Sequence, residues 1–170
     1  MNLLSTVFGY AGTLCLVLSF QFRKERTLFV CQMLSGLLFV LHYGLAGDYT
    51  GMLMDGMCFV RSLMMASGKK ALKGKPAMLV LCAVIVALCA LSWDGLLSLF
   101  PTVALLASTL ALFTGKGDVI RRTQLFCTSP SWLVYNFYVS SWPGVICETL
   151  DMGSVIVYYF RRLSQSKKKK

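Results

Sequence analysis

The stretch PAMLVLCAVIVALCALSWDGLLSLFPTVALLASTLALF, Pro76 to Phe113, decides the fold. It consists of two apolar runs, Pro76–Trp93 and Gly95–Phe113, and its one charged residue, Asp94, lies between them. A helix of about 20 apolar residues spans a hydrocarbon core of about 30 Å. The stretch therefore predicts two membrane-spanning helices joined by a tight turn.

The composition of the rest of the chain agrees with a membrane protein. Of its 170 residues, 56% are hydrophobic and 14% are charged, against about 25% charged in soluble domains. The formal net charge of +10 does not indicate a nucleic-acid partner, because the basic residues flank apolar runs as membrane anchors do. We expect membrane lipids to be the main partner of the surface.

Apolar runs between charged or turn-forming residues predict an all-α protein with seven spans. They are Leu3–Phe22, Thr27–Ala46, Thr50–Ser67, Pro76–Trp93, Gly95–Phe113, Thr123–Ser140 and Trp142–Phe160. The connections are too short for a soluble domain, so consecutive helices must be antiparallel neighbours.

The basic residues fall on one side of this predicted arrangement. Of the 17 lysines and arginines, all except Arg61 follow spans one, three, five or seven. The other side carries Asp48 and Asp94. The positive-inside rule then places the N-terminus outside and the C-terminus in the cytoplasm. Met1 to Phe22 lacks a basic start, which predicts a retained helix rather than a cleaved signal peptide.

No motif for catalysis, for a metal or for a cofactor is visible in the chain. The seven cysteines lie in or beside apolar runs, and the lone histidine has no nucleophile or ligand at a defined spacing. We expect free thiols, no disulfide framework, no bound cofactor and no enzymatic activity.

An internal repeat relates the two ends of the chain. LLFVLHYGLAGDYTGMLMDGM, from Leu37, aligns with WLVYNFYVSSWPGVICETLDM, from Trp132. His42 then falls on Asn136 and, after a one-residue shift, Asp55 falls on Glu148. A three-helix unit changes sides, so one linker helix between two copies restores their orientation. We predict a 3+1+3 arrangement of parallel repeats: 1–67, the linker 68–98, 99–162, and a basic tail 163–170.

Two stretches resemble the YgjV family of bacterial inner-membrane proteins. They are LFPTVALLASTLALFTGKGDVIRRT, Leu99 to Thr123, and SWLVYNFYVSSWPGVICETLDMGSVIVYYFRR, Ser131 to Arg162. The resemblance implies a bacterial inner-membrane location and a fold, and it brings no biochemical activity with it.

A more distant resemblance concerns GYAGTLCLVLSFQFRKERT, Gly9 to Thr27, which is similar to the first helix and turn of the PQ-loop proteins. That superfamily includes the SWEET and SemiSWEET sugar facilitators. Phe20-Gln21 stands where those proteins have Pro-Gln, and the proline is thought to act as a hinge there. Its absence means that their gating mechanism is not carried over.

Four ionisable residues lie within the predicted spans, where an unpaired charge costs at least about 2.5 kcal/mol. They are Asp55, Arg61, Glu148 and Asp151. They predict a polar cavity between the repeats, or alternatively a structural ion pair of Arg61 with Asp151 or Glu148. Near them we expect a platform for a polar solute, with the alternative of core packing. Its members are His42, Trp132 and Asn136.

These features predict a transporter or facilitator of a small polar solute that uses alternating access between two three-helix repeats. The seven candidate binding residues are His42, Asp55, Arg61, Trp132, Asn136, Glu148 and Asp151. The alternative is a receptor or assembly protein of the same fold that transports nothing, as the KDEL receptors of that superfamily are. A cavity that can be connected to both sides of the membrane would favour the transporter.

Overall fold

A computed structural model describes residues 2–19 and 25–167 of the chain, and these residues form helices and turns without a strand. The all-α prediction is therefore confirmed for the described part. Six α-helices are regular: α1 (Leu3–Ser19), α2 (Glu25–Ala46), α3 (Tyr49–Ala66), α4 (Lys75–Leu91), α5 (Leu99–Phe113) and α8 (Trp142–Lys167). Short 3-10 turns, η1 (Lys70–Lys73) and η2 (Leu96–Ser98), precede α4 and α5.

The seventh long helix is built from three pieces. Helix α6 (Gly117–Thr123) continues through a π-helical turn, η3 (Gln124–Thr128), into α7 (Ser129–Tyr138). The π-helical turn ends at Thr128, two residues before Pro130, which has no backbone N–H to donate. A wider turn at this point accommodates the lost hydrogen bond without breaking the helix.

Most predicted boundaries agree with the helices to within a few residues, and two differ more. The sixth helix begins at Gly117, six residues before the predicted start at Thr123, and the last helix ends later than predicted. Helix α8 continues past Phe160 to Lys167, because the polar sequence that follows the apolar run is still compatible with a helix. Three parts of the predicted features lie outside the described residues. They are Phe20-Gln21, Phe22 at the end of the first predicted span, and Lys168–Lys170.

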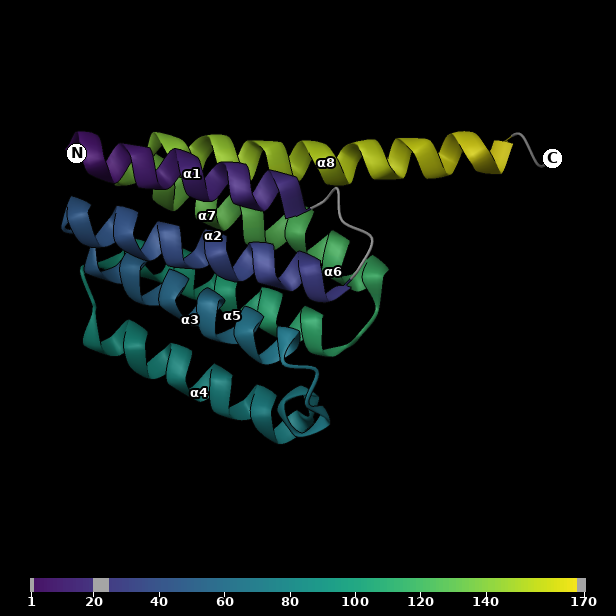
Figure 1. Ribbon diagram of the computed structural model, residues 1–170, viewed down its shortest axis with the longest axis horizontal. Helices are drawn as coiled ribbons and strands as arrows, with labels where there is room; N and C mark the ends of the chain where they lie inside the picture. Colours follow the sequence, from purple (N-terminus) through teal and green to yellow (C-terminus); the bar gives the residue numbers. More distant parts are fainter. Residues whose placement is uncertain (1, 20–24, 168–170) are drawn as a thin grey trace.

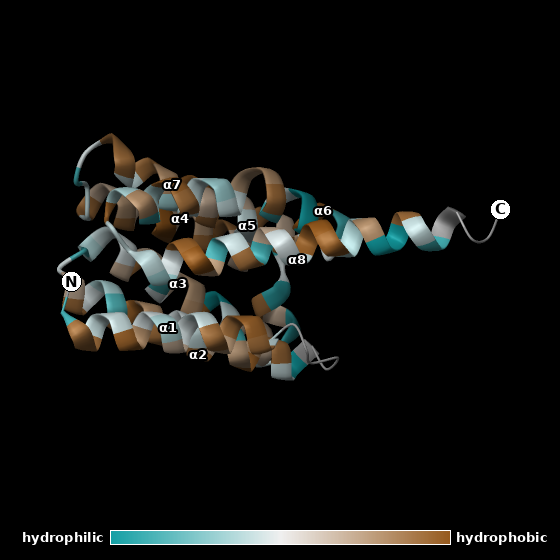
Figure 2. Cartoon of the chain, turned by 90° about the horizontal axis from the view of Figure 1, so that it is seen from above, coloured by the Kyte–Doolittle hydropathy of each residue, from teal (hydrophilic) through white to brown (hydrophobic). Residues whose placement is uncertain are grey.

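Many large apolar side chains are exposed and several polar side chains are fully buried, which is unusual for a soluble protein. Large apolar side chains face outward, with Leu79 and Phe137 respectively 63% and 62% exposed, whereas His42 and Asn136 are 0% and 1% exposed. Figure 2 shows apolar residues distributed along the helices of the bundle. Such a surface is not stable in water, and it suits a lipid environment.

The helices run side by side along the long axis of the molecule (Figure 1). The contacts between them join six of the described helices into a closed ring. In order round the ring, the neighbours are α1, α2, α3, α5, α7 and α8, and α8 packs again on α1. Helix α4 lies outside this ring against α3 and α5. We call the two ends of the bundle the Asp48 end and the Lys116 end, after the turns that lie there.

Two described helices are long and apolar enough to cross a membrane by themselves. They are Arg26–Ala46 and Leu96–Phe113, and two shorter apolar helices are Leu3–Ser19 and Lys75–Leu91. Helices α3 and α8 are less apolar because they carry the ionisable residues. Helix length and composition therefore leave the seven-span topology a prediction from the sequence.

Two turns at the Asp48 end are built alike. Gly47 and Ser140 have positive φ angles of 81° and 57°, and each precedes a helix cap, Asp48 or Ser141. Each cap residue donates its amide to the carbonyl five residues earlier, at 3.0 and 2.8 Å. Each cap side chain also accepts from the amide three residues later, at 2.9 and 3.4 Å. Both turns thus reverse the chain in the same way.

The likeness of the turns holds at one constant separation of 93 residues. This separation pairs Gly51 with Gly144 and Asp55 with Glu148, as the sequence alignment did. Before the turn it pairs Tyr43 with Asn136. The one-residue shift in the alignment is therefore unnecessary, and Tyr43 rather than His42 corresponds to Asn136.

Helix α8 leaves the bundle at the Lys116 end and extends well beyond it (Figure 1). Arg162 donates to Asp118 at 2.7 Å, and the guanidinium of Arg121 lies 3.9 Å from the centre of the Tyr158 ring. The hydrogen bond from Arg162 lowers the pKa of the exposed Asp118 carboxyl. These contacts fix the base of the extension to α6.

Candidate functional site

The centre of the helix ring holds a polar cavity of ≈ 140 Å³. Every helix of the ring contributes side chains to it, whereas no residue of α4 lines it. Six of the seven predicted binding residues lie on its wall: Asp55, Arg61, Trp132, Asn136, Glu148 and Asp151. Residues more than 70 positions apart in the sequence thus meet in one space.

Arg61 does not form the ion pair that the sequence suggested. Its guanidinium donates to the hydroxyls of Ser108 at 2.7 Å and Thr109 at 3.0 Å, both on α5. No salt bridge joins it to an acidic residue within the described part of the chain. The ion-pair hypothesis is therefore wrong in this structure, because α5 supplies acceptors closer to Arg61 than the acids of α8.

The two acidic residues of α8 have different surroundings. Asp151 accepts a hydrogen bond of 3.0 Å from the side-chain amide of Gln124, which also donates to Ser129 at 2.9 Å. The Oε2 atom of Glu148 is buried and has no hydrogen-bond partner. A buried acceptor without a donor is uncommon in proteins and calls for a ligand or another explanation.

Aromatic rings form one part of the cavity wall. Tyr43 stacks on Phe39 and on Trp132, with ring centroids 6.0 and 6.4 Å apart. The Tyr43 hydroxyl donates to the side-chain carbonyl of Asn136, and both residues are almost fully buried. Gly144 packs directly against Asn136 and leaves no room for a Cβ atom.

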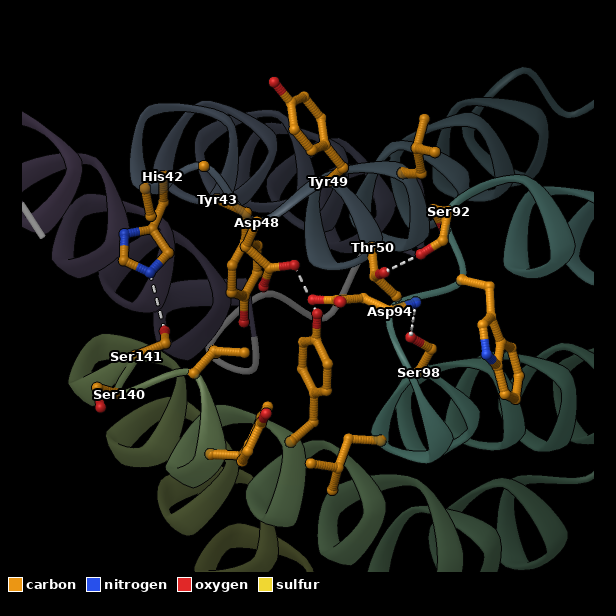
Figure 3. A pocket seen from close by; sticks show the side chains of 18 of the residues that line it. His42, Tyr43, Asp48, Tyr49, Thr50, Ser92, Asp94, Ser98, Ser140 and Ser141 are labelled. Carbon is orange, nitrogen blue, oxygen red and sulfur yellow. Dashed lines mark hydrogen bonds between the residues drawn. The ribbon is translucent and has the colours of Figure 1, made fainter.

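A second cavity of ≈ 1000 Å³ lies at the Asp48 end. Figure 3 shows its lining, where His42, Asp48 and Ser141 project from the two turns and from α2. Tyr43 lines both this cavity and the central one, so its ring separates them.

His42 belongs to this end of the molecule and not to the central cavity, which corrects its predicted place. Its Nδ1 donates to the carbonyl of Ser5 at 2.8 Å, so its Nε2 accepts from the Ser141 hydroxyl at 2.8 Å. Both ring nitrogens are therefore occupied by protein groups. The residue ties α1 and α2 to the turn before α8.

Three side-chain hydrogen bonds cross the Asp48 end between α2 with its turn and α7 with its turn, and two of them appear in Figure 3. Two of these bonds, His42 to Ser141 and Tyr135 to Asp48, correspond to each other at the separation of 93 residues. The third bond joins two positions that are themselves 93 residues apart. The bonds join His42 to Ser141, Tyr135 to Asp48 and Tyr43 to Asn136.

A third cavity, of ≈ 700 Å³, opens at the Lys116 end. Its wall shares Gln32, Gln124 and Asp151 with the central cavity. The central cavity therefore shares wall residues with a cavity at each end of the bundle. The hydrogen bond from Gln124 to Asp151 lies where the second and third meet.

Three residues of the site were missed from the sequence: Gln32, Tyr43 and Gln124. Gln32 and Gln124 are uncharged amides within or beside apolar runs, and a search limited to ionisable residues passes over them. The alignment that places His42 on Asn136 puts Tyr43 on Phe137, one residue away from Asn136, which it contacts in the structure. A list of every amide and hydroxyl in the spans would have found all three.

An apolar exterior around an ionisable interior defines a helical membrane protein. Residues 3–166 match the model of the Imp-YgjV family, described as a bacterial inner membrane protein, and the chain belongs to this family. No curated protein and no solved structure matches the chain. The likeness to SWEET and PQ-loop proteins stays a prediction from the sequence.

Proposed function

We propose that this inner-membrane protein carries a small polar solute across the membrane by alternating access. The observation that carries the proposal is that the central cavity shares wall residues with a larger cavity at each end of the bundle. A receptor or an assembly protein needs one opening, whereas a carrier needs a site that can reach both sides in turn. The central cavity has such neighbours at its two ends.

The proposal includes seven crossings, with the Asp48 end outside and the Lys116 end in the cytoplasm. Helices α1 and α4 have 17 residues each, and such a helix rises about 26 Å, close to the hydrocarbon thickness of about 30 Å. The turns at the Lys116 end hold the basic clusters, and those at the Asp48 end hold Asp48 and Asp94. The positive-inside rule favours this orientation.

Two three-helix halves, α1–α3 and α5–α8, are part of the same proposal. The matching turns and the constant separation of 93 residues support it. So does the ring, in which α3 meets α5 as α8 meets α1. Helix α4 then acts as the linker between the halves. Two parallel halves that enclose a central site are suited to opening at either end.

The present conformation has a barrier between the central cavity and the Asp48 end. It consists of Tyr43 and the three hydrogen bonds that cross this end. Breaking these bonds would join the ≈ 1000 Å³ cavity to the central one. Because a net hydrogen bond is worth about 1 kcal/mol, three of them form a barrier that thermal motion can open.

Reporter fusions test the proposed topology. A reporter that is active only outside the cytoplasm should be active when fused at Asp48 or Asp94. It should be silent at Lys73, Lys116 or the C-terminus, because these sites belong to the basic turns and tail. A silent fusion at Asp94 would contradict the seven crossings.

Labelling of Cys58, which lines the central cavity, tests alternating access. A variant that keeps this cysteine alone would be treated with a charged, membrane-impermeant methanethiosulfonate in right-side-out and in inside-out vesicles. We expect labelling from both sides. Asn136→Ala removes one bond of the barrier, so labelling from outside should become about fivefold faster.

The matched control is a variant that keeps Cys82 on α4, which does not line the central cavity. Its labelling should be unaffected by Asn136→Ala. Labelling of Cys58 from a single side, in both the parent and the Asn136→Ala background, would contradict transport and fit a receptor or an assembly protein.

A further inference from the structure

Resting on the transport function proposed above, we propose that the solute is a small organic cation, such as a protonated amine. Its charge would lie beside Asp55 and Glu148, and its hydrocarbon part would lie against the aromatic wall of the central cavity. The inference depends on four features of that cavity: its charge, an unpaired oxygen, the nature of its wall and its size.

The charge of the cavity is unbalanced. Three carboxylic acids and a single guanidinium line it. The guanidinium of Arg61 donates to hydroxyls of α5 and forms no salt bridge with the acids among the described residues. Carboxylates at membrane depth without a counter-charge are costly. A bound cation supplies this counter-charge, and a neutral or anionic solute does not.

The unpaired oxygen shows where hydrogen-bond donors are missing. Oε2 of Glu148 is buried and accepts no hydrogen bond, although Asp151, one helical turn later, has a donor in Gln124. An alkylammonium group carries up to three N–H donors and no acceptor. It therefore supplies the donor that this oxygen lacks, together with a positive charge beside the carboxyl group.

The wall indicates an organic cation rather than a metal ion. No group of three or more acidic, histidine or cysteine residues in the described part of the chain is placed to hold a metal. Instead, Phe39, Tyr43 and Trp132 line the same cavity as the acids. Aromatic faces attract organic cations and also cover their hydrocarbon groups.

The size of the cavity limits the solute. A volume of ≈ 140 Å³ corresponds to about five water molecules at about 30 Å³ each. Amines with a few carbon atoms fit this space, whereas a disaccharide does not. The aromatic wall is on the side of Tyr43, towards the Asp48 end, and Asp151 lies towards the Lys116 end.

Binding can be measured without transport, because one tryptophan reports on the cavity. Of the three tryptophans, Trp132 is 6% exposed and lines the cavity, and the other two are at least half exposed. A variant with Trp93→Phe and Trp142→Phe keeps Trp132 as the single fluorophore. It would be titrated in detergent with propylammonium, with 1-propanol as a neutral match, and with propionate and ribose.

We expect a saturable change of Trp132 fluorescence with propylammonium and none with the other three solutes. Glu148→Gln and Asp55→Asn should each weaken propylammonium binding about tenfold or more, because each removes a carboxylate that faces the cation. Asp118→Asn, which changes an exposed acid outside the cavity, should leave the binding unchanged.

The results separate this inference from the proposed function. Saturable binding of ribose without binding of propylammonium would overturn the cation, and Cys58 labelling from both sides would still support transport. Conversely, propylammonium could bind while radiolabelled propylamine does not enter proteoliposomes and Cys58 is labelled from one side only. This result would contradict transport and would still support the cation site. Equal affinity of the parent and Glu148→Gln for propylammonium would also overturn the proposed site.

Discussion

Replacement of Gly144 by alanine is expected to lower the free energy of unfolding of the detergent-solubilised protein by about 2 to 3 kcal/mol, as overpacking does in cores. A Cβ atom at this position would lie 2.5 Å from Cγ of Asn136, which is buried and hydrogen-bonded to Tyr43. The added methyl must displace that side chain or push α8 away from α7. Thermal or denaturant unfolding measures the loss.

Gly153→Ala is the matched control, because it makes the same change in the same helix. A Cβ atom at Gly153 meets nothing within 4 Å. Alanine has a higher helix propensity than glycine, by up to about 1 kcal/mol, so this variant should be as stable as the parent or more stable. A Gly144→Ala protein as stable as Gly153→Ala would contradict the close contact of α7 and α8.

His42→Ala should also destabilise the protein strongly, by about 3 kcal/mol. It removes a fully buried ring that bonds to Ser5 and Ser141, and each lost bond leaves a buried group unpaired. The space left by the ring adds a cavity cost. Unfolding in detergent would show the loss, and affinity for a solute would separate a structural role from a binding role.

The control for His42 is replacement by glutamine, which can keep one donor and one acceptor. We expect His42→Gln to recover part of the stability and to bind the solute as the parent does, since His42 does not line the central cavity. A stable His42→Gln protein that has lost solute binding would instead return His42 to the binding site.

Much of the site could be predicted because charge inside an apolar run is a strong signal. Asp55, Arg61, Glu148 and Asp151 stand out in the sequence for this reason, and the structure gathers them around one cavity. The helices could also be predicted, because apolar length and turn residues define them without any knowledge of their packing.

The remaining errors concern the direction in which a side chain faces round its helix and the residue that it contacts. Neither can be read from a linear sequence. His42 and Tyr43 are neighbours in the chain, but α2 turns one towards α1 and the other towards the central cavity. A one-residue error in the repeat was enough to exchange their roles. Likewise, nothing in the sequence shows that Ser108 and Thr109 would reach Arg61 before an acid does.

The π-helical turn at Gln124–Thr128 makes the two sides of the central cavity mechanically unequal. Helix α2 is α-helical along its full length, whereas its counterpart contains a wide turn followed by Pro130, where one rung of the hydrogen-bond ladder is missing. Helix α2 therefore resists bending more than the helix made of α6, η3 and α7, which has a joint at the π-helical turn. Gln124 and Thr128, the ends of that joint, line the cavity. We therefore expect this helix to bend at Gln124–Thr128 more readily than α2 bends, and such a bend would move only one side of the cavity wall.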